Sequence, residues 1–359
     1  MSEPSASQAM RDPYLEWIAA EGLPVAEDFG VDLFQVETRP WARLGANGAA
    51  VHLKGRGDFC NMFLYELAPG GASAPQRHLY EEVVCVLAGR GSTAIEVERG
   101  QTHSFEWGPG SLFAIPLNAR HRHFNGSGAE RALLASTTTL PVVLNLFHNP
   151  AFVFDNDWHF AERIGRPGYF KGEGEYVALG QNHLWETNFV PDLAGIGLGE
   201  YGARGAGGRN LKLILADGTM HAHISELPAG TYKKAHRHRG GIHVVCVTGR
   251  GYSLLWNQGE RDFHRFDWQH GHVHVPPEDM FHQHFNLSPE RSRYVAVGLG
   301  SNRYPFTASA RRTKSGGSNT SVKEGGDQIE YQDQSPDIHP LYREEMRKAG
   351  VEVRMPEFA

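Results

Sequence analysis

The chain has 359 residues, of which 40% are hydrophobic, and its formal net charge is −6 at pH 7. This length suffices for two domains with ordinary cores, while the acidic balance predicts no nucleic-acid partner and no membrane surface. No apolar signal region and no apolar run of membrane-spanning length are evident, so we expect a cytoplasmic protein. Three cysteines do not make a disulfide framework, and Cys85 and Cys246 are expected to be buried strand residues.

The first 49 residues are expected to form an arm with one short helix. Asp12 can cap a helix that starts at Pro13 and is ended by Gly22. The segment after it, which includes Trp41, predicts an extended chain that packs on a barrel or reaches a second subunit. We assign no chemistry to this arm.

From about residue 50 the pattern changes to short alternating apolar segments separated by Gly and Pro. The chain contains 42 Gly and 20 Pro, as a protein with many turns requires. This pattern predicts an all-β barrel or sandwich. The strands expected in this part are Asn61–Leu67, Glu82–Leu87, Ser92–Val97, Ser111–Ile115 and Ala132–Ala135.

An internal repeat indicates that two such units follow one another. Val83–Cys85 aligns with Val244–Cys246 at an offset of 161 residues, and three single residues further along the chain align at the same offset. The glycine pair 89/91 aligns with 249/251 at an offset one residue shorter. These three matches are Pro116 with Pro277, His121 with His282 and Asn125 with Asn286. We therefore predict barrels at 50–140 and 210–305, a connector at 141–209, and a polar linker and C-terminal tail at 306–359 with a helix from Pro340 to Lys348.

Histidines at alternate positions mark the second repeat. Successive side chains on a strand face opposite ways, so His236 and His238 form a pair on one face. His282 and His284 repeat this spacing, and a barrel that joins the two strands would focus imidazoles on one point. Imidazole is a ligand for zinc, copper, iron and nickel. The alternative is a hydrogen-bonded histidine cluster without metal, which is costly to desolvate.

The stretch from Gly230 to Asn286 resembles the cupin superfamily, whose motifs run G-x5-H-x-H-x3,4-E-x6-G and G-x5-P-x4-H-x3-N. His243 stands where that family usually has glutamate, and Gly249 follows it after five residues rather than six. The residues that fit the two motifs are Gly230, His236 and His238, then Gly271, Pro277, His282 and Asn286.

A three-histidine set without the glutamate is similar to that of the gentisate-type ring-cleaving dioxygenases in this superfamily. The resemblance implies a bicupin, which is an all-β chain of two tandem jelly-roll-like barrels. It also implies Fe(II) and oxidative C–C cleavage of a hydroxylated aromatic acid.

The first repeat carries a different set of polar residues. Gln76 stands at the place of His236, Glu82 at that of His243, and His78 and His121 at those of His238 and His282. A neutral amide is a poor ligand for a borderline metal. His78, Glu82 and His121 can still form a second site of two histidines and one carboxylate, or a residual group whose members satisfy each other. We expect the principal centre in the second barrel.

Three further residues have open roles. His243 is a fourth ligand, a group behind the ligands or a general base. His284 shares a face with His282 and can replace it as ligand or act in catalysis. Lys234 precedes His236 by two residues, and on a regular strand it would face inward and hold a carboxylate or phenolate; otherwise Lys233 and Lys234 form a solvated turn.

Four aromatic residues of the second repeat can line a pocket for a ring or fill a core. They are Tyr252, Trp256, Phe281 and Phe285.

Together these observations predict a metal-dependent bicupin, first a non-haem Fe(II) dioxygenase acting on a hydroxylated aromatic or related small acid. The alternatives are an oxygen-independent Mn or Zn decarboxylase, isomerase or hydrolase, and a non-enzymatic small-molecule-binding bicupin. Ni or Cu can also occupy such a site. We expect an anionic substrate, dioxygen as a partner, no nucleic acid or membrane, and a homo-oligomer.

Overall fold

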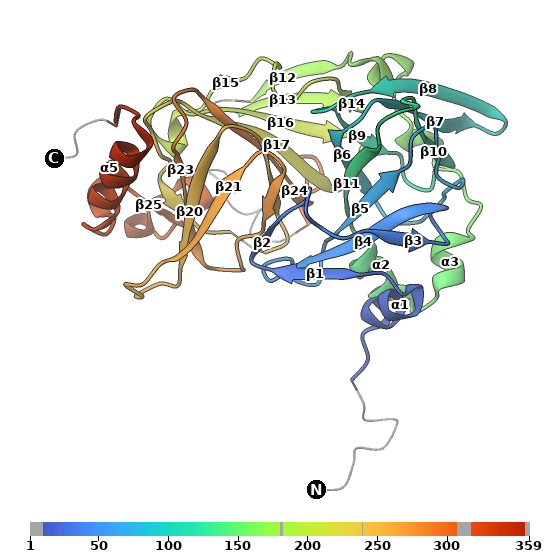
Figure 1. Cartoon of the computed structure of the whole chain (residues 1–359), viewed down its shortest axis with the longest axis horizontal. Coiled ribbons are helices and arrows are strands. Elements are labelled where there is room, and N and C mark those ends of the chain that lie inside the picture. The colour runs from blue at the N-terminus through green and yellow to red at the C-terminus, as the bar shows by residue number, and fades with distance from the viewer. Residues whose placement is uncertain (1–9, 180–181, 239, 307–316, 356–359) are drawn as a thin grey trace, which may run out of the picture.

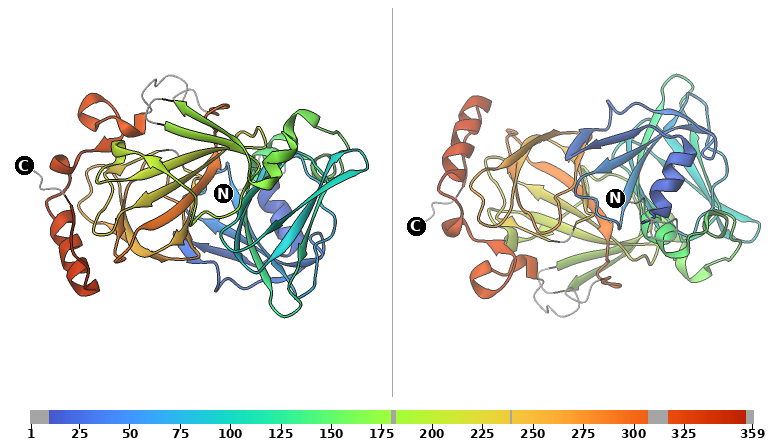
Figure 2. Two further views of the ribbon diagram at one scale, coloured as in Figure 1. Left: turned by 90° about the horizontal axis from the view of Figure 1, so that it is seen from above. Right: turned by 90° about the horizontal axis from the view of Figure 1, so that it is seen from below.

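A computed structural model describes residues 10–179, 182–238, 240–306 and 317–355. Two β-barrels lie side by side, with α1 on the first barrel and α5 at the far end of the second (Figures 1 and 2). The prediction of an all-β chain with tandem barrels, an N-terminal helical arm and a C-terminal tail is therefore confirmed.

The first barrel consists of two sheets. The smaller has the order β10 (His121–Asn125), β7 (Gly91–Glu98) and β8 (Gln101–Trp107). The larger has the order β1 (Val25–Asp28), β4 (Ala46–Leu53), β5 (Asn61–Leu67), β11 (Ala132–Thr138), β6 (Glu82–Ala88), β9 (Leu112–Ile115) and β14 (Phe189–Val190), with β3 (Arg39–Trp41) paired to β4.

The second barrel repeats this plan. Its smaller sheet has the order β21 (His264–Gln269), β20 (Arg250–Trp256), β23 (Phe281–Asn286), β18 (Ala235–His236) and β25 (Gln328–Ile329). Its larger sheet has the order β12 (Glu175–Leu179), β13 (Asn182–Thr187), β16 (Arg209–Leu215), β17 (Met220–Leu227), β24 (Ser292–Leu299), β19 (His243–Thr248), β22 (His272–His274) and β2 (Gly30–Asp32), with β15 (Gly199–Glu200) paired to β16.

The arm and the connector exchange strands between the barrels. β2, from the N-terminal arm, pairs with β22 of the second barrel, and β14, from the connector, pairs with β9 of the first. The arm thus reaches the other barrel of the same chain. The boundaries near residues 50, 140, 210 and 305 stay predictions.

Helices lie at the ends of the chain and in the connector. α1 (Pro13–Glu21) is capped by Asp12, whose carboxylate accepts from Leu15 N at 2.9 Å, and it ends at Gly22 with φ 66°, as predicted. α5 (Ile338–Ala349) begins two residues before its predicted start. No helix in the described ranges is long and apolar enough to cross a membrane. The connector adds α2 (Leu140–Phe147) and α3 (Pro150–Phe154), and short 3-10 turns are η1 (Ala161–Arg163), η2 (Pro167–Lys171), η3 (Gly202–Arg204), η4 (Gly317–Asn319), η5 (Val322–Glu324) and η6 (Tyr331–Asp333).

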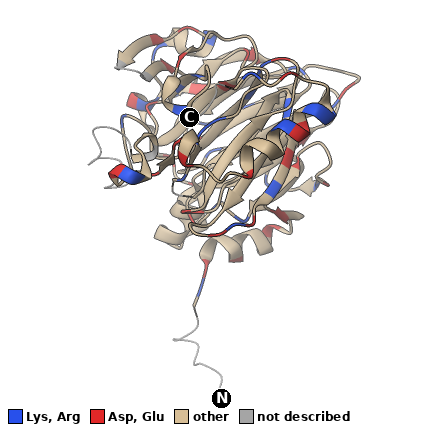
Figure 3. Ribbon diagram, turned by 90° about the vertical axis from the view of Figure 1, so that its left-hand side faces the viewer, with Lys and Arg blue, Asp and Glu red and all other residues tan. Residues whose placement is uncertain are grey.

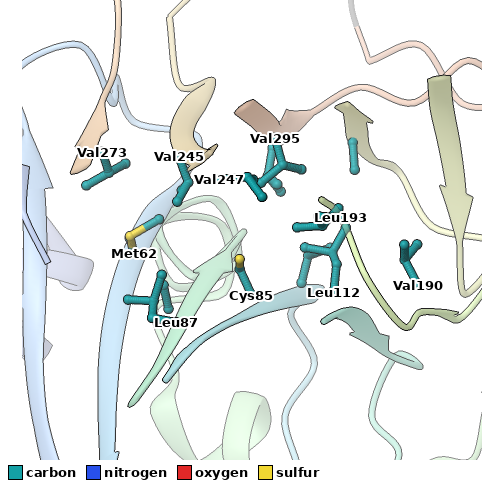
Figure 4. Packing of buried hydrophobic residues seen from close by; sticks show 14 of the residues in the cluster. Met62, Cys85, Leu87, Leu112, Val190, Leu193, Val245, Val247, Val273 and Val295 are labelled. Atoms are coloured by element: carbon teal, nitrogen blue, oxygen red, sulfur yellow. The ribbon is translucent and has the colours of Figure 1, made fainter. Parts of the chain in front are cut away.

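A shared apolar core joins the two barrels. Met62, Cys85 and Leu87 from the first barrel and Val245 and Val273 from the second belong to one buried cluster (Figure 4). Because side chains alternate along a strand, residues next to these face the interior of their own barrel. Each central strand therefore has one face in the shared core and one in its barrel.

The C-terminal tail covers the outer face of the sheet that contains β20 and β23. Tyr342 and Met346 of α5 are fully buried in a cluster with Tyr252 and Phe285. Positive and negative side chains are interspersed on this side of the molecule (Figure 3). The tail is thus part of the folded second barrel rather than an appended linker.

Tyr342→Ala should destabilise the chain by about 3–5 kcal/mol, as for other buried aromatic truncations. The side chain is 0% exposed, and its hydroxyl donates to the carbonyl of Asn286 at 2.9 Å. Urea unfolding would measure the change. Arg347→Ala in the same helix is the matched control, because its ion pair with Glu344 is exposed and should contribute less than about 1 kcal/mol. Equal stability of the two variants would contradict the packing of the tail.

Candidate metal centre

The fold brings three predicted histidines of the second barrel together. His236 on β18 lies directly opposite His282 on β23, and the ring centroids of this pair are 4.2 Å apart. The ring of His238 lies 4.6 Å from that of His282 and 5.5 Å from that of His236. One ligand nitrogen from each ring lies within 4.8 Å of the others, so the three can hold one metal ion.

The chemistry of this group fits a metal ion. Burial, together with neighbouring positive groups, holds the pKa values of His236 and His282 well below the usual range, so both rings are neutral and keep a lone pair for a metal. Nδ1 of His282 faces the carbonyl of Met280 at 3.3 Å. Nδ1 of His236 is buried and has no hydrogen-bond partner in the structure, which is an unmet polar atom that an ion or water would complete.

His243 is not part of this group. It is the first residue of β19, opposite Val297, on the strand face that carries Val245 into the shared core. Burial is the main cause of its lowered pKa, and the charged or titratable side chains that lower it further are Arg56 and His52. The structure therefore does not bring His243 to the ligand group, whether as a fourth ligand, as a group behind the ligands or as a general base.

Ile242 occupies the place that Glu82 has in the first barrel. A Cβ added to Gly298 would lie 2.5 Å from Cδ1 of Ile242, so this side chain lies over β24 inside the barrel. The spacing to the next glycine shows that Glu82 and Ile242 are equivalent. Six residues separate Glu82 from Gly89, and six separate Ile242 from Gly249. An alignment displaced by one residue exchanges the two faces of a strand. The three-histidine group has an apolar neighbour at the glutamate position.

Lys234 points away from the barrel interior. Tyr232 pairs with Phe285, and His236 pairs with His282, so four steps on one strand oppose three on the other. Such a bulge changes which side chains face inward. Lys234 lies on the outer side, in an ion pair with Glu330 of the tail, so the structure does not show the inward position that a regular strand would give it.

Lys233 is the inward lysine. It is 5% exposed, and its Nζ donates to the hydroxyl of Tyr294 at 3.0 Å. Burial would raise the pKa of Tyr294, but the charge and hydrogen bond of Lys233 lower it overall. Either lysine could face inward on the sequence pattern alone, and the bulge determines that Lys233 does.

His284 shares the inward face of β23 with His282 but lies deeper in the barrel. Its Nδ1 is 2.7 Å from Oγ of Ser253, and its ring centroid is 5.5 Å from that of His282 and 6.5 Å from that of His236. It does not belong to the convergent group of ligand atoms. Its ring lies between that group and Tyr294, whose ring centroid is 5.1 Å away.

The four aromatic residues considered for a ring pocket face outward. Tyr252, Trp256, Phe281 and Phe285 all belong to the cluster beneath the tail. The inward positions between them on β20 and β23 are occupied by Ser253, Leu255 and the histidines. These aromatics fill an outer core and do not surround the three-histidine group.

The first barrel also assembles a candidate ligand group. His78, Glu82 and His121 place one ligand atom each within 4.8 Å of the others, and all three are buried. Nε2 of His78 is 3.0 Å from Oε2 of Glu82, and Nε2 of His121 is 3.7 Å from the same oxygen. The hydroxyl of Tyr65 donates to the other carboxylate oxygen at 2.9 Å.

The ionisation states of this group suit a cation. Burial would raise the pKa of Glu82, but the hydrogen bond from His78 and the nearby imidazoles lower it overall. Burial lowers the pKa of His121 to about 3. Carbonyls of Tyr80 and Ala119 lie 2.9 Å and 3.0 Å from the Nδ1 atoms of the two histidines, which orients Nε2 toward Glu82.

Gln76 is turned away from the ligand group of the first barrel. Its amide donates to the carbonyl of Arg43 at 2.9 Å and to that of Ala74 at 3.1 Å. It supplies structure rather than a ligand, and the first barrel offers two histidines and one carboxylate.

Comparison with known proteins identifies the barrel type. Residues 63–136, which lie within the first barrel, match the family described as Cupin domain. The second barrel repeats the same strand plan, so the fold is that of two tandem cupin barrels. A search of curated proteins found no match.

Solved structures with a similar chain path include oxalate decarboxylases. One structure of oxalate decarboxylase is 15% identical with a TM-score of 0.49, and it covers 76% of this chain and 77% of that chain. A mutant of the Bacillus subtilis enzyme is 14% identical with a TM-score of 0.49 and the same coverage. A third, described by the Mn(II) centres of the Bacillus subtilis enzyme, is 14% identical with a TM-score of 0.48 and covers the same shares. Similarity at this level carries no conclusion about reaction.

The position of His243 predicts a pH dependence of stability. Burial lowers the pKa values of His243 and His52 to about 4, whereas an unfolded histidine titrates near 6.5. The unfolded chain then binds more protons between pH 6.5 and about 4, so the free energy of unfolding falls as the pH falls through this window, by at most about 1.4 kcal/mol per pH unit and group.

His243→Leu should therefore flatten the pH dependence of the free energy of unfolding, measured by urea titration between pH 4 and 7. Leucine suits the site because Nε2 of His243 is buried without a hydrogen-bond partner in the structure. His159→Leu at an exposed position is the control and should keep the wild-type slope. Identical slopes for wild type and His243→Leu would contradict this account.

Proposed function

We propose that this protein is a metal-dependent enzyme that acts on a small carboxylic acid at the second barrel. The observation that carries the proposal is the convergence of His236, His238 and His282, whose ligand nitrogens lie within 4.8 Å of one another. Three neutral imidazoles leave the charge of a divalent ion uncompensated and leave coordination positions for substrate oxygens. An anionic substrate complements such a site.

The three histidines would hold a divalent first-row transition metal, and the bound ion supplies Lewis-acid polarisation of substrate oxygens. The protein's own residues do the rest. The carbonyl of Met280 orients His282, and Ser253 holds His284 through its Nδ1 at 2.7 Å. We assign to His284 the role of carrying a proton to or from the substrate, because it is the inward ring adjoining the ligand group.

We propose the oxygen-independent class, a decarboxylase, isomerase or hydrolase, ahead of the Fe(II) dioxygenase. The outward orientation of Tyr252 and Phe285 supports this order, since it removes the aromatic lining expected for a ring substrate. Polar inward residues such as His284 and Ser253 suit a small polar acid instead. Ring cleavage with dioxygen stays as the alternative reaction.

A second ion in the first barrel is a separate proposal. His78, Glu82 and His121 form the two-histidine, one-carboxylate set that suits a divalent metal. A hydrogen bond from Tyr65 to Glu82 holds the carboxylate in place without a metal as well. Metal stoichiometry distinguishes a loaded first barrel from a residual one.

His236→Ala should remove most of the metal bound in the second barrel, because the remaining two imidazoles make a much weaker site. Gln76→Ala, at the matching position of the first barrel, should leave the metal content unchanged, since its amide bonds to backbone carbonyls. Metal analysis of anaerobically purified protein would measure both. Equal loss from the two variants would overturn this ranking of the barrels.

Turnover tests the reaction class. Metal-loaded wild type should convert a member of a panel of small mono- and dicarboxylic acids under nitrogen, with carbon dioxide release and product formation followed together. The matched control is His236→Ala, which should be inactive. Oxygen uptake on gentisate or catechol, with no anaerobic turnover, would replace the oxygen-independent class by the dioxygenase. Protein that binds no metal would end the enzymatic proposal.

A further inference from the structure

A cationic wall lines the second barrel opposite its histidine group. On β17, Ala222 and Ile224 belong to the shared core, so the alternating His221 and His223 face the interior. Lys212 on β16 pairs in register with His223 and shares its face. These residues are connected to the histidine group through Tyr294, whose ring contacts those of His223 and His284.

Lys233 extends this wall toward the deeper part of the barrel. Its Nζ lies 4.7 Å from the ring centroid of Tyr294, and that ring lies 6.1 Å from His223 on one side and 5.1 Å from His284 on the other. Arg204 adds a further guanidinium, which donates to Gln328 of the tail at 3.1 Å. A continuous set of inward side chains therefore runs from the ligand group to Lys233.

Four described strands of the barrel place no acidic side chain beside this wall. The inward residues of β16, β17, β23 and β24 include no Asp or Glu, and Glu226 on β17 faces the other way, where it pairs with Arg293 at 2.7 Å. Neither Lys212 nor Lys233 has an ion pair with a described residue. The hydroxyl and ring of Tyr294 offset only part of the cost of burying the ammonium group of Lys233, because burial still lowers its pKa overall.

The first barrel has apolar residues at the positions equivalent to this wall, and its one charged inward group beside the histidines is a carboxylate. Phe63 and Leu134 face inward there and belong to its buried core, and Glu82 supplies a carboxylate to the two histidines. The two barrels share their strand plan but have opposite charge inside. Strand geometry alone therefore does not require lysines at these places.

We propose that Lys233 and Lys212 determine substrate specificity by binding acidic groups of a small molecule with at least two negative charges. This inference rests on the proposed function in its choice of barrel and extends it to the substrate class. One acidic group lies toward the three-histidine group and the other toward the lysines. Lys212, His221 and His238 are half-buried rather than fully buried, so this surface is not sealed from solvent.

The pKa directions agree with this assignment. Burial lowers the pKa values of Lys233 and Lys212, as expected for ammonium groups held without an anion. A bound dianion would compensate both charges. Charge-assisted hydrogen bonds to carboxylates are among the stronger polar contacts in proteins.

Calorimetric titration of the full-length protein with malonate and with acetate tests the proposal. Wild type should bind malonate more tightly than acetate. Lys233→Met should weaken malonate binding by about 10- to 100-fold, because it removes a charged hydrogen-bond donor, with metal content and melting temperature retained. Lys234→Met is the matched control: its ion pair with Glu330 lies outside the barrel, and malonate affinity should change by less than about twofold.

Lys212→Met provides a second route if Lys233→Met does not fold, and it should also weaken malonate more than acetate. Unchanged malonate affinity in a folded Lys233→Met protein, or no preference for malonate in wild type, would overturn the proposal. The same titration on chelator-treated protein separates the two hypotheses. If the protein binds no metal but Lys233→Met still weakens malonate binding, the anion site stands and the enzymatic proposal falls. If turnover depends on metal but Lys233→Met changes neither turnover nor malonate binding, the anion site alone falls.

Discussion

Strand alternation around a shared apolar core decides which side chains reach the interior of each barrel. Central strands give one face to the cluster between the barrels, as Val245 does, and the other face to their own interior. Any chemistry must then be placed on the second face. A shift of one residue moves a side chain from one environment to the other, so the whole site depends on register, and small irregularities in register have chemical consequences.

The bulge before β18 shows this dependence directly. The same irregularity occurs in the first barrel, where Ala72 pairs with Phe124 and Gln76 with His121. It is therefore part of the common plan and not a defect of one copy. In the second barrel it turns Lys233 inward while leaving His236 opposite His282, and thus combines a cation and a candidate metal ligand on one inner surface.

The fold and the three convergent histidines were predictable because they depend on local signals. Glycine spacing, alternating apolar residues and the repeated His-x-His pattern can each be recognised without knowing which strand is the partner. The positions of His243 and Lys234 differ from those expected for one reason: a single sequence does not show where two strands gain or lose a residue relative to each other. The sequence did not predict that Lys212 and His223 face the barrel interior, for a related reason. Their orientation follows only once the apolar residues next to them on β16 and β17 are known to lie in the shared core.

The C-terminal tail connects this core chemistry to the outside of the molecule. β18 contains only Ala235 and His236, and such a short strand makes few hydrogen bonds of its own. It is held between β23 on one side and β25 of the tail on the other, where His236 pairs with Gln328. Burial of Tyr342 beneath the same sheet fixes the tail. Because Gln328 of the tail pairs with His236, the fixed tail also holds the backbone of His236 in place. An outer apolar cluster therefore stabilises the position of a candidate metal ligand whose strand is too short to hold it alone.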